Sequence, residues 1–104
     1  MRAVLVSLAL LAGLASGASA AEVTITQKDK NFSEKTVEIG VGDTLRFVND
    51  DDITHNVHSS TDGESFDLGA QAPGTESSHT FSHPGEVKIR CAIHPKMKLT
   101  VTVK

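Results

Sequence analysis

The stretch VKIRCAIHPKMKLTVTV, residues 87–103, carries the clearest structural signal in this chain. Apolar and polar residues alternate before and after a short loop, and this period of two is typical of half-buried β-strands. Val87 and Ile89 share one face of the first run, and Leu99, Val101 and Val103 share one face of the second. The stretch therefore predicts two strands joined by a tight loop.

The same alternation recurs upstream, at residues 23–26, 37–41 and 45–47. Turn-forming residues separate the runs, among them Gly42-Asp43 and Pro84-Gly85. No stretch of useful length has the helical period. The pattern predicts one all-β domain, a sandwich or barrel of about seven or eight strands.

The first 20 residues resemble an export signal. Arg2 gives a positive start, an apolar run extends from Val4 to Leu14, and Ala18-Ser19-Ala20 offers a small-residue cleavage site. The run is too short to cross a bilayer, which takes about 20 apolar residues. We expect cleavage after about Ala20, a mature domain over residues 21–104, and an exported protein that does not span the membrane.

The charge balance argues against one class of partner. The chain has 10 basic and 13 acidic residues, and Arg2 belongs to the expected signal, so nine basic residues remain against 13 acidic ones. The sequence shows no basic cluster. Because nucleic-acid binding depends on neutralising phosphates, we exclude nucleic acid as a partner.

Cys91 is the only cysteine. Small exported domains usually pair their cysteines, so a lone one is either a buried apolar thiol or a metal ligand. Cys91 has the parity of Ile89, which directs its sulfur to the core side. The loop that follows adds His94 and then Met97, whose parity is that of Leu99, so Met97 is either core filler or a further ligand.

Thiolate and thioether ligands select copper, and two histidines and one cysteine with a weak axial methionine form a blue-copper site. His55 is the best candidate for the second imidazole, because it shares parity with the apolar Val57; the alternative is a buried histidine satisfied by hydrogen bonds. The remaining histidines are expected at the surface: His58, His79 and His83.

The acidic run Asp50-Asp51-Asp52 suggests either a calcium loop or a solvated turn. It lacks the spaced ligands and the closing glutamate of an EF-hand. We therefore expect a solvated turn.

Four segments together resemble the cupredoxins, and most closely the amicyanin-like and plastocyanin-like bacterial members. They are VGDTLRFVN (41–49), HNV (55–57), FSHPG (81–85) and CAIHPKM (91–97). The resemblance implies a Greek-key β-sandwich or barrel and one copper ion per chain. It also implies that His55, Cys91 and His94 bind copper equatorially and that Met97 caps it axially.

By the same resemblance, Asn56 and Pro95 support the ligands from outside the coordination sphere, Asn56 by tying the two ligand-bearing loops together. Many relatives have Ser or Thr directly after the ligand cysteine, whereas this chain has Ala92. Any hydrogen bond from Asn56 to this loop must therefore go to the backbone.

Four protein ligands leave no open position for a substrate, which favours electron transfer over catalysis. We expect a monomeric periplasmic carrier of single electrons, with partners such as a periplasmic dehydrogenase or cytochrome c. The alternative is a copper-binding or delivery protein in copper homeostasis.

The resemblance places the docking surface around His94. Ile93 and Pro95 would form an apolar patch there. Lys96 and Lys98 flank the loop and either steer an acidic partner or are ordinary solvated lysines.

Overall fold

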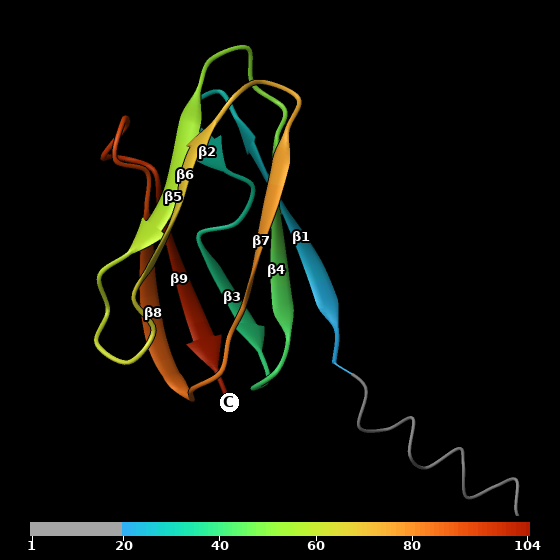
Figure 1. The fold of residues 1–104 in the computed structure, drawn as a ribbon, viewed down its shortest axis with the longest axis vertical. Coiled ribbons are helices and arrows are strands. Elements are labelled where there is room, and N and C mark those ends of the chain that lie inside the picture. Colours follow the sequence, from blue (N-terminus) through green and yellow to red (C-terminus); the bar gives the residue numbers. More distant parts are fainter. Residues whose placement is uncertain (1–19) are drawn as a thin grey trace, which may run out of the picture.

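The computed structural model describes residues 20–104, which form nine β-strands (Figure 1). The expected signal over residues 1–20 lies outside the described residues, apart from Ala20. No helix of the described part is long and apolar enough to cross a membrane. The strands are β1 (Glu22–Lys28), β2 (Asn31–Phe32), β3 (Thr36–Ile39), β4 (Thr44–Asn49), β5 (His55–Ser59), β6 (Phe66–Gln71), β7 (Glu76–Thr80), β8 (Gly85–Arg90) and β9 (Lys98–Val103).

The strands form two sheets that pack against each other (Figure 1). One has the order β2-β1-β4-β7 and the other the order β3-β9-β8-β5-β6. The pairs β1–β4 and β3–β9 are parallel, whereas the others are antiparallel. The predicted all-β sandwich is thus confirmed. It has nine strands in two separate sheets, so the alternative of a closed barrel is wrong.

The core lies between the sheets and follows the alternation of the sequence. Ile25 and Phe47 come from one sheet, and Ile89, Leu99 and Val101 from the other, and all are fully buried. Burying a large aliphatic or aromatic side chain contributes about 1.5–3 kcal/mol. The register that buries these residues therefore also fixes which way their neighbours point.

The alternation over residues 37–41 ends earlier than the sequence indicates. Strand β3 stops at Ile39, and Val41 is exposed. Gly42 has a φ of 95°, a conformation that favours glycine, and the backbone N–H of Gly40 donates to a carboxylate oxygen of Asp43 at 2.8 Å. These contacts form a turn, so Val41 continues the pattern but not the strand.

One end of the sandwich, uppermost in Figure 1, carries the β1–β2 turn, the β4–β5 link, the β6–β7 turn and the β8–β9 loop. Asn49, the last residue of β4, holds the β4–β5 link in place through its side chain. Its Nδ2 donates to the carbonyl oxygens of Ile53 and Gln71, each at 2.9 Å. These bonds set the point at which β5 begins, which is His55.

Candidate metal centre

Three metal-binding side chains from distant parts of the chain meet at this end. Nitrogens of His55 and His94 and the sulfur of Cys91 all lie within 4.8 Å of one another. The Sγ of Cys91 is 3.9 Å from the Nδ1 of His55. His55 is 0% and Cys91 1% exposed, whereas His94 is partly exposed. The structure therefore brings the three predicted ligands into one compact cluster that reaches solvent at His94.

Strand ends place these side chains. His55 begins β5 and pairs with Gln71 of β6, and Cys91 directly follows β8. Within the β8–β9 loop, the backbone N–H of Met97 donates to the carbonyl oxygen of His94 at 2.9 Å. This turn returns the chain to the core, where Met97 is buried. The burial of Met97 is consistent both with a residue that only packs in the core and with an axial copper ligand, so axial ligation by Met97 stays a prediction.

The chemistry of the cluster fits copper. The Nδ1 of His94 is buried and has no hydrogen-bond partner among residues 20–104. A buried polar atom without a partner costs free energy, which a bound metal would offset. Two imidazole nitrogens and one sulfur suit copper, whereas calcium and magnesium prefer oxygen ligands.

The sulfur has one further contact. The backbone N–H of Asn56 points at the Sγ of Cys91 with a separation of 3.3 Å. Hydrogen bonds to a ligand sulfur stabilise its negative charge and tune the potential of a bound metal. Because the donor belongs to β5, the strand that presents His55 also restrains Cys91.

The side chain of Asn56 connects three segments. Its Oδ1 accepts the backbone N–H of Ala92 at 3.0 Å, and its Nδ2 donates to the carbonyl oxygen of Gly69 at 3.0 Å and to Asp67 at 2.9 Å. The bond to the β8–β9 loop thus goes to the backbone. Asn56 joins β5 both to that loop and to β6, while its effect on bound copper stays a prediction.

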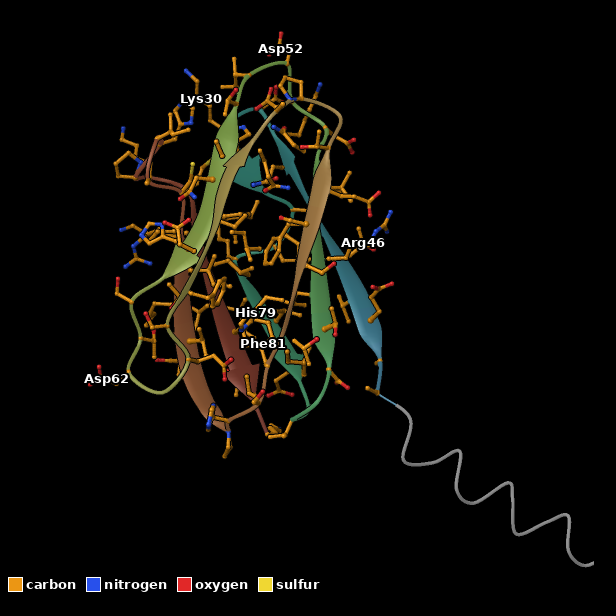
Figure 2. All side chains as sticks on the ribbon, in the orientation of Figure 1. Lys30, Arg46, Asp52, Asp62, His79 and Phe81 are labelled. Carbon is orange, nitrogen blue, oxygen red and sulfur yellow. The ribbon has the colours of Figure 1, made fainter. Side chains whose placement is uncertain are left out.

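Asp51 is a residue of this site that the sequence analysis missed. Its Oδ2 lies 2.9 Å from the Nε2 of His55 and accepts the backbone N–H of Lys30 at 3.0 Å. The Asp51 side chain is 7% exposed, so the expected solvated turn is wrong at this position. Asp52 alone of these three residues is labelled in Figure 2, and it projects outward at the upper end.

The contacts of Asp51 keep it charged and orient its histidine. The hydrogen bond to His55, followed by that from the backbone of Lys30, holds the pKa of Asp51 well below its usual range. Because the Asp51 carboxylate holds Nε2 of His55 by a hydrogen bond, Nδ1 is left free to face Cys91. Metal-binding histidines commonly have such a partner on the ring nitrogen that does not bind the metal. The spacing of four residues between Asp51 and His55 was a usable signal in the sequence.

The predicted docking residues lie at the surface beside His94. Ile93 is 48% exposed, and Pro95, Lys96 and Lys98 are also exposed. Ile93 and Pro95 help to line a hollow of about 420 Å³ that His94 also reaches. A role of these residues in docking stays a prediction.

His79 was expected at the surface but is 19% exposed at its side chain. It stacks on Phe66 with ring centroids 3.8 Å apart, and its Nε2 lies 2.8 Å from a carboxylate oxygen of Glu64. Figure 2 shows it near Phe81, well below the upper end. His83, by contrast, is largely exposed. Neither belongs to the cluster of His55, Cys91 and His94.

Comparison with known proteins agrees with this site. A family model described as copper binding proteins of the plastocyanin/azurin family matches residues 19–104. The methylamine utilization protein MauL of Methylorubrum extorquens is 33% identical over 105 residues, covering 99% of this chain and 92% of MauL.

Solved structures share the fold. A copper-containing nitrite reductase, NirK of Thermus scotoductus, is 32% identical with a TM-score of 0.74 over 80% of this chain, which spans only 22% of that protein. A Cu(I) structure of an amicyanin variant has a TM-score of 0.74 at 22% identity, covering 80% of this chain and 82% of amicyanin. The chain therefore belongs to the plastocyanin/azurin family of copper binding proteins and is a cupredoxin, whose metal is copper.

Proposed function

We propose that this protein carries single electrons between redox proteins, with His55, Cys91 and His94 as equatorial copper ligands and Met97 as the axial one. Bound copper supplies the one-electron Cu(I)/Cu(II) couple. The observation that carries the proposal is the cluster of His55, Cys91 and His94 within 4.8 Å, buried except at His94.

The surroundings of the ligands favour small rearrangement on electron transfer. Asp51 fixes the ring of His55, and the backbone of Asn56 restrains Cys91. Ligands held by packing and hydrogen bonds stay close to one geometry in both oxidation states. Because four protein ligands leave no position for a substrate, an enzymatic role is not part of the proposal.

The route for the electron would run through His94. This ring is the partly exposed member of the cluster. Ile93 and Pro95 beside it offer an apolar contact that excludes water when a partner docks. For a partner protein in contact with this loop, the His94 side chain alone would separate the partner from the metal.

The expected signal and the relatives support a location and a class of partner. A signal cleaved after about Ala20 would deliver residues 21–104 to the periplasm as a monomeric carrier. MauL is named for methylamine utilization, which favours a periplasmic dehydrogenase or a cytochrome c as electron donor or acceptor.

Titration of purified residues 21–104 with Cu(II) tests the proposal. We expect intense visible absorption in the parent and in His83→Ala, but none in Cys91→Ser and a changed spectrum in His94→Ala. Repeated reduction and reoxidation should leave copper bound. Release of copper to an acceptor protein on reduction would instead indicate copper delivery, and unchanged absorption in Cys91→Ser would refute the ligand assignment.

A further inference from the structure

A groove extends from His94 along the side of the molecule. One hollow of about 420 Å³ is lined by Lys30 and by the apolar Ile93 and Pro95. A second, of about 600 Å³, is lined by Lys35, Lys98 and residues 31–34. Asn31 and Lys96 line both hollows, so the two hollows adjoin, and their combined lining is here called the lysine groove.

The lysine groove is positive on an acidic protein. Its lining includes four lysines against two acidic residues, Asp29 and Glu34. The rest of residues 21–104 has five basic against eleven acidic residues. The sequence showed no basic cluster because these lysines come from two segments, residues 30–35 and 96–98, which the fold brings together.

The positive charge of the groove is not neutralised within the described part of the chain. Lys30, Lys35, Lys96 and Lys98 form no ion pair there, whereas Lys88 pairs with Glu86, and Arg46 and Lys104 also have carboxylate partners. Free charges on one face attract an oppositely charged surface and raise its rate of association.

The β1–β2 turn connects the groove to the metal cluster. Asp29 and Lys30 both have positive φ, 51° and 60°, so the two-residue turn has a backbone that non-glycine residues rarely adopt. The backbone N–H of Lys30 donates to Asp51, which also contacts His55. Figure 2 places Lys30 at the upper end of the molecule, the end where the cluster lies. The position of the turn is therefore fixed relative to His55.

We propose that the lysine groove docks an acidic face of a redox protein, so that carboxylates occupy the groove while an apolar part of the partner covers Ile93 and Pro95. This inference rests on the proposed function and identifies the partner's chemistry. The acidic character of the rest of the chain would repel an extended anionic membrane or nucleic acid, whereas a compact acidic patch fits beside it.

Binding of fluorescently labelled poly-L-glutamate to the copper-free chain tests the inference by anisotropy. The test variant is Lys35→Gln/Lys96→Gln. The matched control is Lys88→Gln/Lys104→Gln, which changes the net charge equally at residues outside the groove. At low ionic strength we expect the test variant to bind about tenfold more weakly and the control less than twofold. At ~0.5 M salt the difference should largely vanish.

Equal weakening in both variants, or no binding by the parent, would overturn the inference. So would binding of phosphatidylglycerol vesicles that depends on the groove lysines without any binding of poly-L-glutamate, since the groove would then recognise a membrane. Circular dichroism verifies that the variants are folded. Because copper is not needed, failure of copper cycling would overturn the proposed function without affecting this result.

Discussion

Replacing Asn56 by alanine should destabilise the fold more than any exposed asparagine would. The side chain is almost fully buried, accepts the N–H of Ala92 and donates to the carbonyl oxygen of Gly69. Alanine removes both hydrogen bonds, including the one that joins the β8–β9 loop to the Asn56 side chain.

The size of the effect follows from these two bonds. A hydrogen bond in a protein contributes about 0.5–1.5 kcal/mol net, so the pair amounts to about 2 kcal/mol. The contacts of Asn56 with the exposed Asp67 and with the partly exposed ring of His58 are left out of this sum because water can replace them. In a domain of this size, 1 kcal/mol shifts the Tm by about 4–8 °C, which predicts a decrease of about 8–16 °C.

Denaturant unfolding of the copper-free protein, followed by circular dichroism, measures this difference without a contribution from bound metal. Asn31→Ala is the matched control, since the side chain of this exposed asparagine has one hydrogen bond in the described chain, to the carbonyl oxygen of Asp29. It should change the unfolding free energy by less than about 0.5 kcal/mol. A loss below about 0.5 kcal/mol in Asn56→Ala would refute the structural role assigned to this residue.

Asp51→Ala should weaken copper binding by about 10–100-fold in a competition titration, because the histidine that it orients loses its hydrogen-bond partner. Burial raises the pKa of Glu64, but hydrogen bonds from two histidines and two backbone amides outweigh it and hold the pKa below its ordinary value. Ionised Glu64 therefore stabilises the fold at pH values above its unfolded-state pKa, and this stabilisation is lost as the pH falls through its folded-state pKa. Denaturant unfolding at pH 7 and at pH 3 measures the difference. Glu64→Gln should lower the free energy of unfolding mainly at pH 7. The backbone N–H of Ala21 donates to a carboxylate oxygen of Asp43 at 2.8 Å, and cleavage after Ala20 would turn this nitrogen into an ammonium beside that carboxylate. Asp43→Asn should then lower the Tm of the processed chain more than that of a chain with one extra N-terminal residue.

The sequence alone predicted the strands and the buried residues correctly where apolar and polar residues alternate clearly. Val87, Ile89 and Leu99 alternate with polar residues, and the same parity correctly placed Cys91 and Met97 inside. His55 was found in the same way. The alternation works here because β8 and β9 lie inside their sheet, with one face toward the core and the other toward solvent.

The edge strand β7 gave no such signal. Strands β6 and β7 each end a sheet, and β7 reads ESSHT, with no apolar residue to mark its inner face. The ring of His79 is shielded from solvent by stacking on Phe66 of β6, which is 13 residues away in the chain. Contacts of this kind depend on how two sheets pack, and local pattern does not contain that information.

Asp51 was missed for a different reason. An acidic run after a strand usually faces water, and two of its three residues do so here. The third turns inward because a buried imidazole nitrogen and a backbone amide both need an acceptor at that point. Once His55 had been identified as a candidate ligand, a partner for its second nitrogen was required, and the carboxylate four residues earlier could have been proposed.

The precision of the metal cluster therefore originates in the register of the core. His55 and Cys91 stand at the ends of β5 and β8, on the same face as the buried Val57 and Ile89. A slip of one residue in either strand would expose its apolar residues and turn its ligand to the opposite face, so the free energy that buries the core also opposes misplacement of the ligand. The carboxylate of Asp51, which accepts a hydrogen bond from the His55 ring, and the backbone N–H of Asn56, which donates to Cys91, then set the orientation of the ring and the sulfur, which register alone leaves undetermined.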